Sequence, residues 1–148
     1  MVKYIHYGST KFDPNIGFPI KNQLGWTKPY GGLWASRVHC KFGWKDWCTL
    51  EDFRECNDTN AFTFTLKKSA NVVTIRCVDD IFKLPQIRVY QSYLYDYTID
   101  FEECLHQNID AIELLISEIP RQYDKLYYAL YCWDCDSILI LNPSIIRI

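Results

Sequence analysis

Five short segments of the chain have the composition of β-strands, and they are spread over the whole sequence. Apolar, β-branched and aromatic residues dominate these segments, and turn-forming residues such as Gly, Ser, Asn and Pro flank most of them. The segments cover residues 3–7, 33–36, 61–66, 71–77 and 137–141. Short strands with helical segments between them predict an α+β fold built on mixed or antiparallel sheets.

The length of 148 residues and the 49% content of hydrophobic residues suit one domain with a sizeable core. No linker or repeat divides the sequence, so we expect a single compact domain over residues 1–148. The net charge of −2 excludes the surplus of Lys and Arg that non-specific nucleic-acid binding requires. No signal peptide is recognisable, and no apolar run approaches the roughly 18 residues of a membrane span. We expect a cytoplasmic protein that does not bind membranes.

Two segments predict the main helices. The first covers residues 43–56, and Thr49 with Asp52 resembles a capping arrangement at which this helix restarts. The second covers residues 101–119, where apolar residues recur at helical spacing until Pro120 ends the pattern. Both helices would pack on the predicted sheet.

Residues 10–30 have no hydrophobic period and contain several Pro and Gly residues, which predicts a long loop. Ordered loops of this length are often lids or binding loops. Gly31 and Gly32 follow it, and we expect them to permit a close approach of backbone segments. Residues 78–98 show no clear preference, and residues 125–133 fit either a helix or a strand.

The seven cysteines are odd in number, and in a reducing compartment we expect them to be small core residues. Cys132 and Cys135 form a C-x-x-C pair, but a structural zinc site requires a second pair that the sequence lacks. We therefore expect no metal. The aromatic content of 16% indicates a dense core, a stacking pocket or both, and we assign Trp44 and Trp47 to the core.

Three motifs carry the chemical information in the sequence. The first is HYGS at residues 6–9, at the end of the first strand. The second is GGLWAS at residues 31–36, followed by the aromatic helical segment GWKDWC. The third is DSILILNP at residues 136–143, in which an acid precedes the last apolar strand. In this order the motifs resemble the diphtheria-toxin/PARP branch of the ADP-ribosyltransferases.

The resemblance covers most of the chain in order and spacing, and it departs from the family at three positions. A tyrosine stands between His6 and Gly8, where the family has His directly before Gly. Trp34 replaces the usual Tyr, and Asp136 replaces the final Glu of PARP-like members. The resemblance implies an ADP-ribosyltransferase-like fold and a mono-ADP-ribosyltransferase, which transfers ADP-ribose from NAD to a macromolecule, here expected to be a protein.

The chemistry of this reaction explains the residue types. Cleavage of the bond between nicotinamide and ribose builds positive charge on the sugar, which a carboxylate stabilises. The resemblance assigns this catalytic role to Asp136. A second acid or a base is expected from Glu102, Glu103 or Asp134, and the sequence does not select among them.

The resemblance also assigns a set of NAD-binding residues. Trp34 and Tyr7 would stack on the nicotinamide ring, and the backbone of Gly8 would approach its carboxamide. His6 would hydrogen-bond the ribose of the adenosine, and Ser9 or Ser36 would steady the pocket. The predicted NAD-binding residues are His6, Tyr7, Gly8, Ser9, Trp34 and Ser36.

Two alternatives keep the same fold. The shorter acid at Asp136 favours a catalytically silent binding or inhibitor protein with an aromatic docking surface. The other alternative is a toxin-like NAD glycohydrolase, which would release nicotinamide without an acceptor. Enzymes of this kind serve as toxins, in phage counter-defence and in host regulation.

Overall fold

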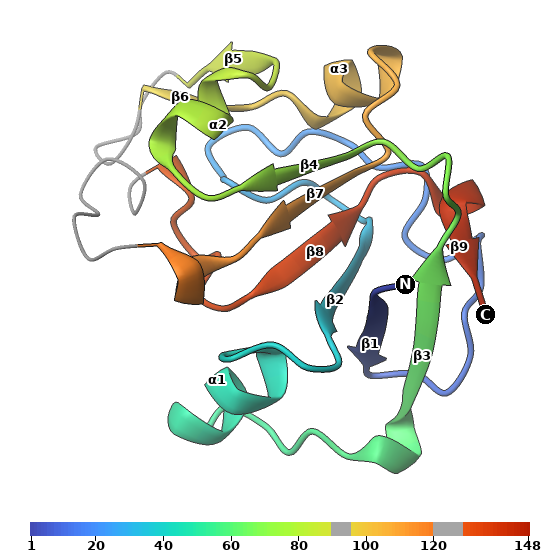
Figure 1. Ribbon diagram of the computed structural model, residues 1–148. Helices are drawn as coiled ribbons and strands as arrows, with labels where there is room; N and C mark the ends of the chain where they lie inside the picture. The colour runs from blue at the N-terminus through green and yellow to red at the C-terminus, as the bar shows by residue number, and fades with distance from the viewer. Residues whose placement is uncertain (90–95, 120–128) are drawn as a thin grey trace.

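A computed structural model describes residues 1–89, 96–119 and 129–148 (Figure 1). The strands in these residues are β1 (Lys3–Tyr7), β2 (Leu33–Arg37), β3 (Ala61–Leu66), β4 (Val72–Ile75), β5 (Gln86–Arg88), β6 (Tyr97–Ile99), β7 (Ala111–Leu114), β8 (Ser137–Ile140) and β9 (Ile146–Arg147). They form one seven-stranded sheet in the order β4-β7-β8-β2-β1-β3-β9 and a small sheet of β5 and β6. The helices are α1 (Trp44–Leu50), α2 (Val78–Phe82) and α3 (Phe101–His106), with 3₁₀ turns η1 (Asp58–Asn60), η2 (Ile116–Glu118) and η3 (Pro143–Ile145). The prediction of an α+β fold is confirmed.

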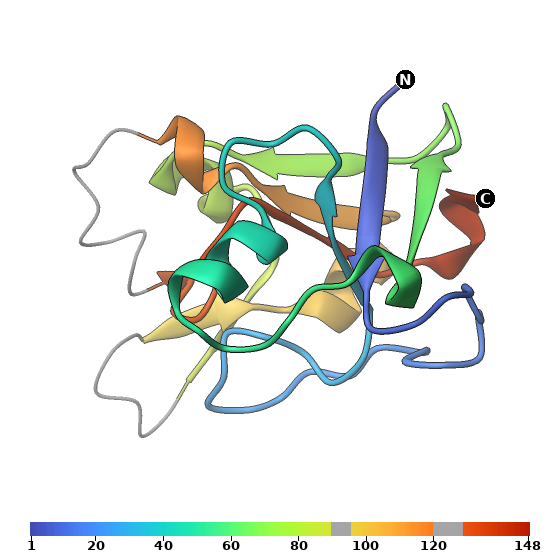
Figure 2. The same cartoon turned by 90° about the horizontal axis from the view of Figure 1, so that it is seen from below.

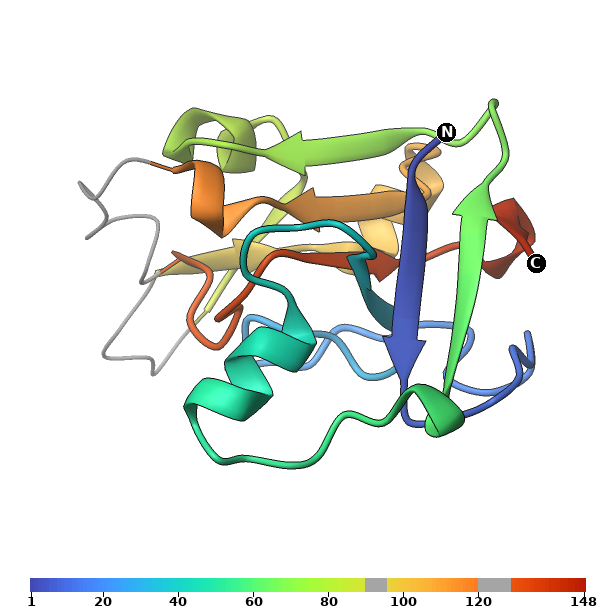
Figure 3. The same cartoon turned by 60° about the horizontal axis from the view of Figure 1, so that its bottom comes forward.

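The large sheet is mixed. Strands β4 and β7 are parallel, and the other neighbouring pairs that the structure describes in this sheet are antiparallel. The sheet is strongly curled, so that β1 and β3 run across the direction of β4 and β7 (Figure 3). This curl is the accumulated right-handed twist of successive strands, and it leaves α1 beside the ends of β1 and β2.

The core lies on both faces of the sheet. Neighbouring residues of β8 belong to different apolar clusters, with Leu139 in one and Ile138 and Ile140 in the other. All four residues of β8 are therefore buried, as are all four of β7. A central strand with both faces covered is apolar along its whole length rather than at every second residue.

The strands predicted at residues 3–7, 33–36, 61–66, 71–77 and 137–141 are all confirmed, with small differences at their ends. The close approach predicted for the glycine pair is confirmed as well. Both glycines have positive φ, and a Cβ on Gly31 would lie 2.2 Å from the carbonyl oxygen of Gly17. On Gly32 it would lie 2.5 Å from the side chain of Leu139, so both positions require glycine.

The helix predicted over residues 101–119 is confirmed over its first six residues and is wrong beyond them. Helix α3 ends at His106, Asn108 adopts the left-handed conformation with φ 59°, and the chain continues as β7. The apolar run of β7 mimics helical spacing because the strand is buried on both faces. Residue 120, where the pattern was expected to end, lies outside the described residues.

The first predicted helix is too long, because α1 ends at Leu50 and Asp52 has a φ of 48° that no helix can continue. The described residues thus contain three short α-helices where about two main ones were predicted. The unassigned segment 78–98 contains α2, β5 and the start of β6, and its residues 90–95 are not described. Of the segment 125–133, residues 125–128 also lie outside the description.

The predicted loop over residues 10–30 is confirmed, apart from an isolated bridge between Lys21 and Tyr30. It runs beside β6 and α3, as the view from below shows (Figure 2). Asn22 fixes it there, because its side chain donates to Asp100 and accepts from the N–H of Phe101 at 2.8 Å. Among the described residues, no helix has the length and apolar composition needed to cross a membrane.

Candidate functional site

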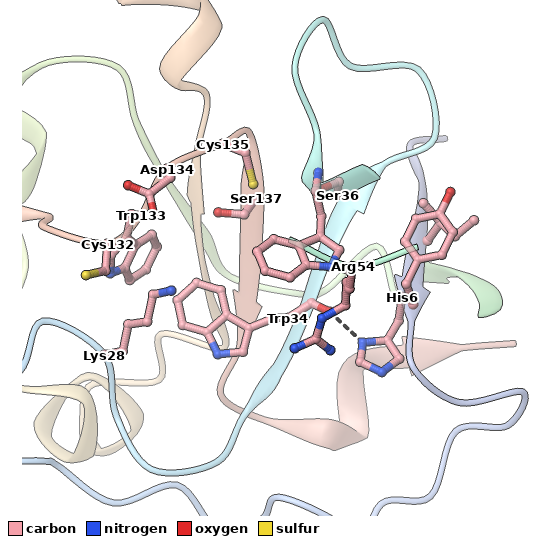
Figure 4. Close-up of a pocket in the computed structure, with 14 residues that line it drawn as sticks. His6, Lys28, Trp34, Ser36, Arg54, Cys132, Trp133, Asp134, Cys135 and Ser137 are labelled. Atoms are coloured by element: carbon pink, nitrogen blue, oxygen red, sulfur yellow. Dashed lines mark hydrogen bonds between the residues drawn. The ribbon is translucent and has the colours of Figure 1, made fainter. Parts of the chain in front are cut away.

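A cavity of about 240 Å³ opens where β1, β2 and β8 meet α1 and the turn before β8 (Figure 4). Its walls come from all three sequence motifs. His6 and Tyr7 lie on β1, Trp34 and Ser36 on β2, and Ser137 at the start of β8. These residues are distant in sequence, and the antiparallel pairing of β1 with β2 and of β2 with β8 brings them together.

One wall of the cavity is aromatic. The rings of Trp34 and Trp133 meet edge to face with centroids 4.7 Å apart, and Trp133 is only 2% exposed. The indole N–H of Trp133 donates to the carbonyl of Thr27 at 3.0 Å, which fixes its ring. Trp34 is half-buried and packs against the apolar core. Such a pair of rings suits a planar aromatic ligand.

The assignment of Trp44 and Trp47 to the core is wrong. Both are half-buried, and their rings stack on each other with centroids 5.1 Å apart at the surface of α1. Phe53 packs edge-on against Trp44 and extends this aromatic surface. Trp44 also lines the cavity, so the surface of α1 continues directly into the site.

His6 has a defined hydrogen-bonding pattern. Its Nδ1 lies 2.7 Å from the carbonyl oxygen of Trp34, which can only accept, so Nδ1 carries a proton. In the neutral ring, Nε2 therefore presents a lone pair. The imidazole also packs at 5.2 Å against Phe62. Nε2 is then the ring nitrogen that is left to accept a hydrogen bond.

The remaining residues of the first motif differ in their positions. Tyr7 lines the cavity, and burial, the largest cause, raises the pKa of its hydroxyl. Gly8 and Ser9 are not among the residues that line the cavity. The N–H of Gly8 donates to the carbonyl of Asn60 at 2.9 Å, and the hydroxyl of Ser9 donates to the carbonyl of Lys11.

Ser36 is buried and links three elements. Its hydroxyl donates to the carbonyl of Asp136 at 2.8 Å and accepts from the backbone N–H of Trp44 at 2.9 Å. The first bond ties β2 to the turn before β8, and the second anchors the start of α1. Ser36 therefore positions Trp44 at the cavity.

Asp136 does not line the cavity. It is 2% exposed, and its carboxylate accepts two hydrogen bonds from Ser117, from the N–H at 2.8 Å and from the hydroxyl at 2.5 Å. The carboxylate that lines the cavity belongs to Asp134, which is exposed. Glu102 and Glu103 do not line it either, and Glu102 instead accepts from Lys21. Of the three residues expected as a second acid or base, Asp134 is the one that lines the cavity.

Two cations at the cavity were not predicted from the sequence. The Nζ of Lys28 lies 5.0 Å from the ring centroid of Trp34, and the guanidinium of Arg54 lies 5.8 Å from that of Trp44. Lys28 belongs to the long loop, and Arg54 follows α1. The only sequence signal for Lys28 is its place in the loop that leads to the glycine pair.

The C-x-x-C pair forms part of the cavity wall. All seven cysteines are free thiols, and Cys135 is buried whereas Cys132 is half-buried. Burial raises the pKa of Cys135 to about 12, and the nearby charge of Lys28 acts in the opposite direction. Within the described part of the chain, no group of three or more His, Cys, Asp or Glu residues is arranged to hold a metal ion.

Comparisons with known proteins gave no match. No protein-family model matches the chain, and searches of the curated proteins and of the solved structures found no similar protein. The function of the site is therefore inferred from its geometry and from the resemblance of its motifs.

Proposed function

We propose that the protein is a mono-ADP-ribosyltransferase that transfers ADP-ribose from NAD to a protein acceptor and releases nicotinamide. One observation supports this proposal above the others. The three motifs that resemble the ADP-ribosyltransferases lie on adjacent strands, and one aromatic cavity is lined by residues from all of them. Nothing in their sequence spacing requires such a convergence.

In the proposed complex, the nicotinamide ring stacks on Trp34, with Tyr7 on the other side of the site. His6 accepts a hydrogen bond from a ribose hydroxyl through Nε2, because its Nδ1 is engaged by the carbonyl of Trp34. The glycosidic C–N bond breaks and nicotinamide leaves with the bonding electron pair. The acceptor then forms a bond to the same ribose carbon and loses its proton to solvent.

The developing positive charge on the ribose requires a carboxylate. Asp134 is the carboxylate that lines the cavity among the described residues, and we assign the charge-stabilising role to it. The catalytic role predicted for Asp136 stays a prediction. The carboxylate of Asp136 accepts hydrogen bonds from Ser117 and does not line the cavity. In the proposed mechanism, Asp136 positions the turn that carries Asp134.

The size of the cavity indicates how much of NAD it holds. A volume of about 240 Å³ is below the about 300–1,000 Å³ of sites that enclose drug-sized ligands. We therefore place the nicotinamide and its ribose in the cavity and the adenosine half along its mouth. The aromatic surface of α1 and the loop over residues 10–30 would then face the acceptor.

Label transfer from tagged NAD into a cell lysate tests the proposal. The enzymes compared are the wild type, Asp134→Asn, Asp136→Asn and, as a matched control, Asp79→Asn, which changes an exposed carboxylate on α2. We expect labelled protein with the wild type and the control, and a loss of label with Asp134→Asn. Loss only in a folded Asp136→Asn variant would move the catalytic acid to Asp136. No label from folded wild type would overturn the transferase.

The buried carboxylate of Asp136 also favours a second candidate, a binding protein of the same fold without catalysis. This candidate predicts that NAD neither binds in calorimetry nor changes tryptophan fluorescence, while a stable protein partner is recovered. Release of nicotinamide by the purified protein at a rate unaffected by lysate would instead identify an NAD glycohydrolase.

A further inference from the structure

The cavity is positively charged although the chain is not. Lys28 and Arg54 both line it, whereas Asp134 is the carboxylate among the residues of its lining. With His6 neutral, two positive charges and one negative charge give the lining a net charge of +1, against −2 for the whole chain. An excess of positive charge at a cavity in an acidic protein indicates a site for an anion.

The structure holds the backbone beside Lys28 firmly in place. Thr27 is 3% exposed, its hydroxyl donates to the carbonyl of Tyr131, and its own carbonyl accepts from the indole of Trp133. Pro29, on the other side of Lys28, is also buried. The loop therefore presents the Lys28 side chain to the cavity from a fixed base.

Both cations lie against aromatic rings. Within residues 1–89, 96–119 and 129–148, Lys28 and Arg54 form no ion pair, and their recorded contacts are with aromatic rings. Lys28 is half-buried and its ammonium lies against the ring of Trp34 rather than against a carboxylate of the described residues. An anionic ligand in the cavity would place an opposite charge beside both cations.

The two cations lie on different sides of the Trp34 side chain (Figure 4). A ligand whose ring stacks on Trp34 therefore has one of the two cations on each side. We propose that Lys28 and Arg54 form an anion-recognition pair that binds the pyrophosphate of a nucleotide seated at Trp34. This inference rests on the proposed function, because it names the residues that would distinguish NAD from free nicotinamide.

Calorimetry with nicotinamide, ADP-ribose and inorganic pyrophosphate tests the inference. The variants are Lys28→Met, which keeps the length of the side chain and removes the charge, Lys28→Arg, which restores the charge, and Arg54→Met. Lys68→Met is the matched control, since it makes the same change in net charge at an exposed turn. Near-ultraviolet circular dichroism verifies that each variant is folded.

We expect Lys28→Met and Arg54→Met to weaken ADP-ribose binding by about 10- to 100-fold, the range of hydrogen bonds to charged groups. Nicotinamide binding should be unchanged in these variants, and Lys28→Arg should recover most of the affinity for ADP-ribose. The wild type should lose affinity for ADP-ribose as salt rises, and Lys28→Met should lose less.

The outcomes separate this inference from the proposed function. If wild type binds NAD and Lys28→Met binds ADP-ribose equally well, the anion-recognition pair is wrong and the proposed function stands. If the wild type binds neither NAD nor ADP-ribose, the proposed function fails. Pyrophosphate binding that Lys28→Met abolishes would still support the pair in that case, and absence of pyrophosphate binding would overturn it too.

Discussion

The carboxylate of Asp136 should contribute more to stability than any other single polar side chain near the site. It is 2% exposed and accepts hydrogen bonds from both the N–H and the hydroxyl of Ser117. Asp136→Ala removes both bonds and leaves the Ser117 N–H without its acceptor. Each bond to a charged group contributes about 1.5–3 kcal/mol, and removal of the carboxylate also relieves the cost of burying it.

We therefore expect Asp136→Ala to lower the free energy of unfolding by about 3 kcal/mol. For a protein of this size, that loss corresponds to a decrease in Tm of about 6–12 °C. Ser117→Ala removes only the hydroxyl bond and should cost about 1.5–3 kcal/mol. Urea unfolding followed by tryptophan fluorescence measures both values, and an unchanged slope against urea confirms that the denatured state is the same.

Asp134→Ala is the control, because Asp134 lies two residues away and is exposed. It should change the free energy of unfolding by less than about 0.5 kcal/mol. An Asp136→Ala variant within about 1 kcal/mol of the wild type would refute the reasoning. In that case the carboxylate is not held by Ser117 and becomes available to the cavity, as the sequence resemblance implies.

Three further predictions concern the loop before β2 and two polar contacts of the sheet. Gly31→Ala places a Cβ 2.2 Å from a backbone oxygen and should cost at least about 2 kcal/mol in urea unfolding. Gly25→Ala, also at positive φ but with open space around the added Cβ, should cost about 1 kcal/mol in the same assay. Arg37→Met leaves the buried Glu113 without the guanidinium that donates to it at 2.6 and 2.7 Å, and urea unfolding should show a loss of about 3 kcal/mol. Burial, and then the charge of Glu113, raises the pKa of Tyr4 above its ordinary value of 10.0. Stability should therefore fall as the pH rises above 10, because the unfolded state loses the phenolic proton first, and Tyr4→Phe should flatten this slope in urea midpoints measured against pH.

Local sequence patterns predicted those parts of the fold whose signals are local. The alternation of apolar residues and Thr in β3 requires one buried face, and Asn142 with Pro143 marks the point where the apolar strand β8 gives way to η3. The run from Ile109 to Ile119 was misread because it contains a strand that is covered on both faces. The apolar pattern of this run fits a helix as well as a buried strand. Its pairing with β4 and β8 makes it a strand, and that pairing depends on the whole fold.

The candidate site shows the same division. His6 and Trp34 could be selected from their motifs, because strand ends and glycine-led strands can be recognised in sequence. Lys28 could not, since it reaches the cavity only through the contacts of Thr27 with Trp133 and Tyr131. The choice between two nearby acids also depends on geometry, because a left-handed residue, Cys132 with φ 71°, shapes the turn that precedes β8.

The place of β8 in the sheet has a consequence for biosynthesis. It lies between β7 and β2, although it follows both in the sequence. During translation, the strands β1, β2 and β3 and the pair β4 and β7 therefore emerge as two pieces that cannot yet join. Each exposes an unpaired edge that is prone to aggregation. The cavity forms only when β8 enters between them, because Ser137 of β8 is part of its lining. A ligand can therefore bind there only after β8 has been synthesised.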